Sequence, residues 1–163
     1  MIDSVRPRRF VAATLACSAA VFGVSVLVGN GRAQAGAVTY TCSAPDKQFI
    51  GTVSSNLVQL RYWSDALVNH DVEPDVVVKQ AREEAVQVGA LQPQDRTLNA
   101  TRGLLGSMFV EYSKAVAVTA RGNDGHTHMQ SAWRLARSVH DLLAGAKAGL
   151  AVQGCDVTPL IGS

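Results

Sequence analysis

Apolar residues recur at intervals of three and four along four stretches of the chain, which is the spacing of an amphipathic helix. The first stretch is predicted to form a helix over residues 43 to about 69. Ser43 and Asp46 have the spacing of a capping box, in which a serine and an acid three residues later bond to free backbone N–H groups at a helix start. The positions expected to face the core are Ile50, Val53, Leu57, Leu60, Ser64 and Leu67.

Two further helices are predicted in the middle of the chain. One runs over residues 74–89, because proline is tolerated in a first helical turn and glycine often follows the last one. The next opens with Pro93 and Asp95 and contains Gly103 and Gly106. Each of these two glycines costs about 1 kcal/mol of helix propensity. We therefore expect either a close neighbouring helix or a bend at this point.

The fourth helix follows the clearest turn in the chain, residues 121–125. Thr127 and Gln130 have the spacing of a second capping box and are predicted to start it. Gly149 or Gly154 would end it. One edge of this helix, expected to face the core, carries Met129, Trp133, Ala136, His140, Leu143 and Lys147.

Four such helices with short connections pack most simply as an all-α, up-down-up-down four-helix bundle. This topology brings both chain ends to the same end of the bundle. Cys42 precedes the first helix and Cys155 follows the last, so one disulfide is predicted to close the bundle near the chain ends. In the chain-entropy view, a loop of this length makes the bond worth about 4–5 kcal/mol. The alternative is two unpaired, buried thiols.

The segment before the helices has the order of an export signal. Three arginines precede an uncharged run over residues 10–31, and the small residues Ala33 and Ala35 follow it. Residues 1–35 are therefore predicted to be a cleavable signal peptide, and residues 36–163 a single helical domain that is secreted or held in the cell envelope. The uncharged run is also long enough to cross a membrane. Membrane contact is expected only in that alternative, an uncleaved anchor.

Loss of the leader would change the charge of the protein. The whole chain holds 15 Lys and Arg against 13 Asp and Glu. The leader takes four arginines and one aspartate, so the predicted domain keeps eleven basic and twelve acidic side chains. No stripe of Lys and Arg remains that would follow a phosphate backbone. Nucleic acid is therefore excluded as the expected partner, and an envelope protein or a small ligand is favoured.

Histidines and an acid gather at the bundle end opposite the disulfide. His70 belongs to the first connection, whereas Asp124, His126 and His128 belong to the third. Imidazole and carboxylate together suit zinc, copper or nickel. A nearby helix N-terminus disfavours the imidazolium form, and neutral imidazole is the form that binds metal. These four residues are the candidate metal or haem site. The alternative is a solvated loop, where such residues are common.

Aromatic residues supply a second candidate for ligand binding. Trp63, Phe109, Tyr112 and Trp133 lie at or near core-facing positions of their helices. They would either pack in the core or line an apolar cleft for a lipid or an aromatic ligand. His140 shares a helix face with Trp133 and is expected to be a hydrogen-bonded residue at the edge of the core.

The sequence contains no nucleophile motif, phosphate-binding glycine loop or metalloprotease motif. No catalytic residue is assigned, and a protein without enzymatic activity is favoured. The leading hypothesis is an exported helical binding or interaction module of the cell envelope or extracellular space. Its alternative is a carrier of metal, haem or lipid that uses the histidine-rich end or the aromatic cleft. An enzyme of unspecified type is the third.

Overall fold

The computed structural model describes residues 38–161, and the predicted signal peptide lies outside this range. The described residues form helices and no strand, which confirms the all-α class. The five helices are α1 (Ala44–Val68), α2 (Pro74–Ala90), α3 (Arg96–Ala120), α4 (His126–Val152) and α5 (Thr158–Ile161). The four long helices correspond to the four stretches of apolar spacing in the sequence.

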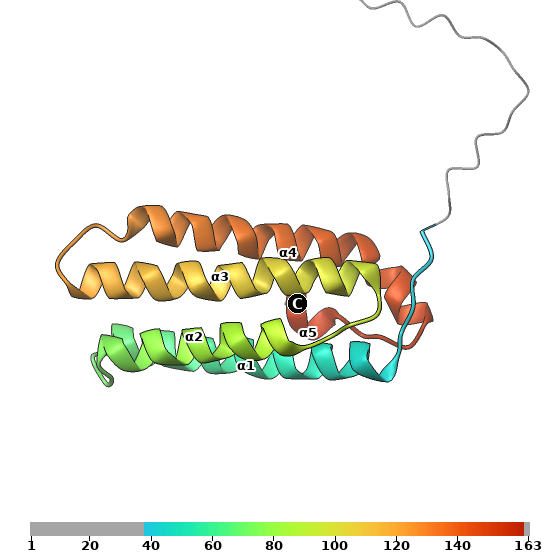
Figure 1. Ribbon diagram of the computed structural model, residues 1–163, viewed down its shortest axis with the longest axis horizontal. Coiled ribbons are helices and arrows are strands. Elements are labelled where there is room, and N and C mark those ends of the chain that lie inside the picture. Colours follow the sequence, from blue (N-terminus) through green and yellow to red (C-terminus); the bar gives the residue numbers. More distant parts are fainter. Residues whose placement is uncertain (1–37, 162–163) are drawn as a thin grey trace, which may run out of the picture. The chain divides into compact units, whose positions relative to one another are not determined.

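The long helices pack side by side as in a bundle (Figure 1). Helix α2 packs against α1 and α3, and α3 packs against α4. The short helix α5, which the sequence analysis did not predict, packs against both α4 and α1. It forms because Val157 and Leu160, which follow Cys155, are both buried. The bundle-like fold is therefore seen, whereas a closed up-down-up-down four-helix bundle stays a prediction.

The two cysteines lie together as predicted. The sulfur atoms of Cys42 and Cys155 are 1.98 Å apart, at disulfide distance, and the Cα atoms are 5.6 Å apart. Cys42 directly precedes the cap of α1, and Cys155 lies between α4 and α5. The bond thus joins the first and last parts of the described domain.

The capping box at the start of α1 is confirmed, and it extends further than the sequence suggested. The Asp46 carboxylate accepts hydrogen bonds from the Ser43 hydroxyl at 2.6 Å and the Ser43 N–H at 2.7 Å. Its other oxygen accepts the N–H groups of Gln94 and Asp95, at 2.7 and 2.9 Å. Burial acts to raise the pKa of Asp46, but these hydrogen bonds outweigh it and lower the pKa. Asp46 therefore ties the start of α1 to the connection between α2 and α3.

A second buried aspartate continues this arrangement. Asp95 caps α3 by accepting the N–H groups of Thr97 and Leu98, at 2.7 and 3.2 Å. Its other oxygen accepts the N–H of Thr41 at 3.0 Å. Thr41 and Ser43 are thus both bound by aspartates, and Cys42 lies between them. We call Asp46 and Asp95 the carboxylate pair.

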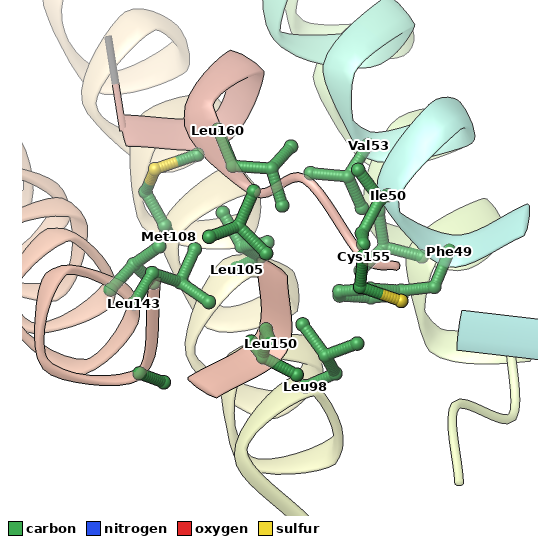
Figure 2. Packing of buried hydrophobic residues seen from close by; sticks show 14 of the residues in the cluster. Phe49, Ile50, Val53, Leu98, Leu105, Met108, Leu143, Leu150, Cys155 and Leu160 are labelled. Atoms are coloured by element: carbon green, nitrogen blue, oxygen red, sulfur yellow. The ribbon is translucent and has the colours of Figure 1, made fainter. Parts of the chain in front are cut away.

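The main core fills the space between the long helices and α5. Figure 2 shows Leu160 of α5 directed into it, toward Val53 of α1 and Leu105 of α3. The largest side chains that are completely or almost completely buried include Phe49, Phe109, Leu98, Leu105, Leu143 and Leu150. The apolar spacing predicted for α1 holds in its first half, where Ile50 and Val53 are buried. Leu57, Leu60, Ser64 and Leu67 are only partly buried.

The edge predicted for α4 is confirmed only in part, because Leu143 is buried as expected whereas Trp133 and His140 are not. Trp133 is 68% exposed, and His140 is an exposed residue whose Nδ1 lies 3.2 Å from Asp141 Oδ1. His140 is therefore not at the edge of the core. The buried side chains of α4 are Ala132, Val139, Leu143, Ala146 and Leu150. Small residues on this face let α3 and α4 pack closely, whereas the bulky indole of Trp133 lies outside.

The start of α4 also differs from the prediction. The helix begins at His126 after Gly125, and no side chain caps it, so the box of Thr127 and Gln130 does not form. A Cβ at Gly125 would lie 2.5 Å from Thr119 Oγ1, so only glycine fits. At the other end Gly154 adopts a φ of +86° just beyond the helix, as expected of a residue that ends one.

The two glycines inside α3 face open space. No atom outside the local backbone lies within 4 Å of where a Cβ of Gly103 or Gly106 would be. The predicted close neighbour is therefore absent at both positions, and α3 continues as one helix through them. They lie instead in a surface groove between α2 and α3.

Replacing Asp46 by alanine tests the role of the carboxylate pair. The change leaves the N–H groups of Gln94 and Asp95 without their acceptor, so we expect Asp46→Ala to lower the free energy of unfolding by about 2–4 kcal/mol. Urea unfolding measures this. The control, Asp65→Ala, removes an exposed carboxylate of α1 whose nearest cation atom, Arg61 Nε, is 3.9 Å away. Its effect should stay within about 0.5 kcal/mol. Equal losses in both variants would contradict this role.

Candidate functional site

A pocket of about 530 Å³ lies between α1, α3 and the first turn of α4. We call it the end pocket, because it lies at the end of the molecule opposite the disulfide. Its apolar walls are Leu67, Val68, Pro74, Ala115, Val116, Ala120 and Met129. Helix α5 packs against α1 and α4 near the disulfide. Ser64 and Leu67, which are only partly buried, line this pocket.

Two hydroxyl groups form a polar point in the apolar wall. Ser64 of α1 and Tyr112 of α3 both line the end pocket, and their hydroxyl oxygens are 2.6 Å apart. Ser64 Oγ also donates a hydrogen bond to the backbone oxygen of Leu60 at 2.7 Å. His70 and Thr119, both exposed residues, complete the polar part of the lining. His70 has a φ of +61°, which is uncommon for a residue other than glycine.

Residues of the candidate metal site each contact a different partner. His128 Nδ1 lies 2.7 Å from Glu111 Oε2, and His126 Nε2 lies 3.4 Å from Gln130 Nε2. Asp124 accepts the backbone N–H of His126 at 2.8 Å, as a turn-forming residue does. Across residues 38–161, no group of three or more His, Cys, Asp or Glu is positioned to hold a metal ion. The metal or haem site at His70, Asp124, His126 and His128 stays a prediction.

Glu111, which sequence reasoning missed, is the acid that His128 meets. Its carboxylate accepts a hydrogen bond from Lys114 Nζ at 2.7 Å and contacts His128 on the other oxygen. The bonds to Lys114 and His128 lower the pKa of Glu111. The Lys114 pairing could have been expected from the i, i+3 spacing. The His128 contact depends on how α3 and α4 pack, which no local pattern contains.

The four aromatic candidates do not form a common cleft. Phe109 is fully buried in the core, and Trp133 is exposed beside Arg134 and Arg137. Trp63 packs edge-to-face on Tyr62, with ring centroids 5.1 Å apart. Tyr112 alone of the four lines the end pocket. The lining of the end pocket therefore consists mainly of aliphatic side chains and one tyrosine.

A groove between α2 and α3 has a volume of about 940 Å³ and is larger than the end pocket. Gly89, Gly103 and Gly106 contribute to its wall, which explains why it is open. Its Arg102 is already engaged, because Nη1 donates to the backbone oxygens of Gly89 and Leu91, both at 3.1 Å. These bonds satisfy carbonyl groups at the end of α2. Arg102 therefore has a structural role in this groove, because it binds the end of α2.

Glu84 is a fully buried acid that the sequence analysis overlooked. Burial raises its pKa to about 7, against the weaker opposing effect of Gln80, whose Nε2 donates to Glu84 Oε1 at 3.5 Å. Among the described residues, Glu84 Oε2 has no hydrogen-bond partner, and neither does Asn56 Nδ2, a buried atom of α1. The sequence contained a signal for the burial of Glu84, because it falls three residues after Ala81 and four before Val88, within the buried stripe of α2.

Comparison of the chain with protein-family models, with curated proteins and with solved structures found no match. Among the described helices, none combines the length and the apolar character needed to cross a membrane. The geometry of the end pocket is therefore the main support for a functional proposal.

Glu84 makes a specific contribution to the pH dependence of stability. Its pKa is raised on folding from 4.5 to about 7, so the folded state binds the proton more tightly. The free energy of unfolding should therefore fall as pH rises from about 4.5 to 7, by on the order of 2 kcal/mol after allowance for solvent screening. Glu84→Gln removes this loss, so the variant should be the more stable protein at pH 8.

Urea unfolding of both proteins between pH 4.5 and 8 measures the difference, and contributions of all other groups cancel in it. Glu83→Gln, a change at the exposed neighbouring position, is the control and should follow the wild-type pH profile. Parallel profiles for the wild type and Glu84→Gln would show that Glu84 ionises normally in the folded protein.

Proposed function

We propose that this protein is a non-enzymatic binding module that holds a small, mostly apolar molecule in the end pocket. The observation that supports the proposal is the pocket itself, about 530 Å³ in volume and walled mainly by aliphatic side chains. Binding sites for small ligands typically measure about 300–1,000 Å³ and combine apolar walls with a few polar groups. The hydroxyl pair of Ser64 and Tyr112 supplies such polar groups.

The energetics favour a ligand with an extended apolar part. Each methylene group removed from water contributes about 0.8 kcal/mol. Association of a small molecule costs at least about 4 kcal/mol of lost translational and rotational freedom. A chain of roughly ten carbons therefore binds in the millimolar range, and roughly fifteen carbons are needed for the micromolar range. The pocket volume is compatible with a molecule of this size.

The proposed place of action is the cell envelope or the extracellular space. The order of arginines, uncharged run and small residues before Gly36 supports removal of an export signal. The disulfide-distance pair of Cys42 and Cys155 is compatible with an oxidising compartment. A module that binds apolar molecules outside the cytosol would meet lipids and other poorly soluble compounds there.

Filling the pocket tests the proposed function. Ala115 is buried and lines the pocket, so Ala115→Leu should place a larger side chain in it and weaken ligand binding at least tenfold. Displacement of N-phenyl-1-naphthylamine, an uncharged fluorophore, by 1-decanol measures the affinity. The matched control is Ala100→Leu, at an exposed position on the same helix, which should bind within about twofold of the wild type. Thermal unfolding checks that both variants are folded. Equal affinity of both variants would refute the pocket as the binding site.

The export proposal has its own test. Material collected outside the cell should give an intact mass that begins at Gly36, with Cys42 and Cys155 protected from alkylation until a reductant is added. Mass spectrometry before and after reduction shows both features. Residues before Gly36 still attached would rule out the cleavage site, and free alkylation of both thiols would rule out the bond.

A further inference from the structure

We infer that the end pocket selects a ligand that donates a hydrogen bond, namely an apolar molecule with a hydroxyl group, over a fatty acid or an ether of the same length. The inference rests on the proposed function and names the ligand class for the same pocket. It comes from the direction of the hydrogen bonds at Ser64 and Tyr112.

The Ser64 hydroxyl has a single hydrogen. Its oxygen lies 2.7 Å from the backbone oxygen of Leu60, one helical turn earlier. A carbonyl oxygen only accepts, so two oxygens this close require the hydrogen of Ser64 between them. The bond is the common back-bond of a serine inside a helix. The hydrogen of Ser64 is therefore committed to Leu60.

The direction of the second bond follows from the first. Ser64 Oγ and Tyr112 Oη are 2.6 Å apart, a distance that requires one hydrogen between them. Because Ser64 has already given its hydrogen to Leu60, Tyr112 is the donor. The hydrogen bonds therefore run from the Tyr112 hydroxyl to the Ser64 hydroxyl, and from the Ser64 hydroxyl to the Leu60 carbonyl.

Tyr112 is left as an acceptor only. Its one hydrogen points to Ser64, while its oxygen keeps an acceptor site for which the described residues supply no donor in any hydrogen bond of the structure. A hydroxyl group of a bound ligand can donate to this oxygen. An ether or carbonyl oxygen cannot, because both sides would then be acceptors.

The charges around the pocket disfavour an acid as well. No lysine or arginine is among the residues that line the end pocket in the described part of the chain. A carboxylate placed there would lose its water without gaining a cationic partner, which is costly. The exposed residues His70 and Thr119 lie in water already and offer little net gain. An alcohol satisfies the tyrosine oxygen without bringing a charge.

Three probes of equal chain length test the inference: 1-decanol, decyl methyl ether, and decanoate at pH 8. Displacement of N-phenyl-1-naphthylamine, an uncharged fluorophore, from the full domain gives the three affinities. We expect the wild type to bind 1-decanol about fivefold more tightly than the ether, which corresponds to one net hydrogen bond, and at least tenfold more tightly than decanoate.

Two variants then separate the hydrogen bond from apolar packing. Tyr112→Phe should bind the ether as the wild type does and bring the ratio of alcohol to ether affinity near one. Ser64→Ala releases the Tyr112 hydrogen, so the ether should gain affinity by about fivefold. Tyr62→Phe, at an exposed tyrosine of α1, is the control and should keep the wild-type ratios.

The outcomes distinguish this inference from the proposed function. If the wild type binds the ether or decanoate as tightly as 1-decanol, the inference is wrong and the apolar pocket stands. If Tyr112→Phe keeps the full preference for alcohol, or Ser64→Ala leaves ether affinity unchanged, the assigned bond direction is wrong. If no probe binds, the proposed function is overturned and the inference falls with it.

Discussion

The buried carboxylate pair, Asp46 and Asp95, is the interaction on which the arrangement of the domain depends. Each carboxylate accepts hydrogen bonds from backbone N–H groups of two separate segments. The pair therefore joins the coil segment before α1, the start of α1 and the start of α3. Burying these charges is tolerable only because so many donors meet them. The disulfide acts at the same place, since Cys42 lies between the two residues that the pair holds.

These constraints lie at one end of the molecule, and the end pocket lies at the other. Near the disulfide, Val157, which directly precedes α5, and Leu160 of α5 add to the core between α1 and α4. At the opposite end, the apolar residues of α1 continue through Leu67 and Val68, although nothing comparable to α5 covers them within the described chain. Apolar side chains that a protein keeps on a concave surface are typical of a ligand site. The fold thus places the disulfide and the carboxylate pair at one end and the apolar end pocket at the other.

The sequence predicted the features that depend on short segments. The capping box of α1, the four long helices and the cysteine pair follow from local spacing and from the position of Cys42 and Cys155. The sequence did not correctly indicate which of two neighbouring helix faces is buried. On α4, Trp133 and Ala132 are adjacent, and the large side chain was taken as the core residue although the small one is buried. The end pocket could not be predicted, because its existence depends on how α1, α3 and the start of α4 pack together, which no local pattern contains.

The chemistry of the pocket combines one local and one distant contact. The bond from Ser64 to Leu60 is set by helix geometry, because a serine reaches the carbonyl one turn earlier wherever the helix forms. The contact with Tyr112 depends on α1 and α3 lying at the right depth. Together the two contacts fix the direction of the Tyr112 hydroxyl hydrogen, which neither residue determines alone. Ser64, which the apolar spacing places on the core-facing side of its helix, thereby directs the hydroxyl of a tyrosine on another helix, and this direction is the basis of the proposed preference for an alcohol.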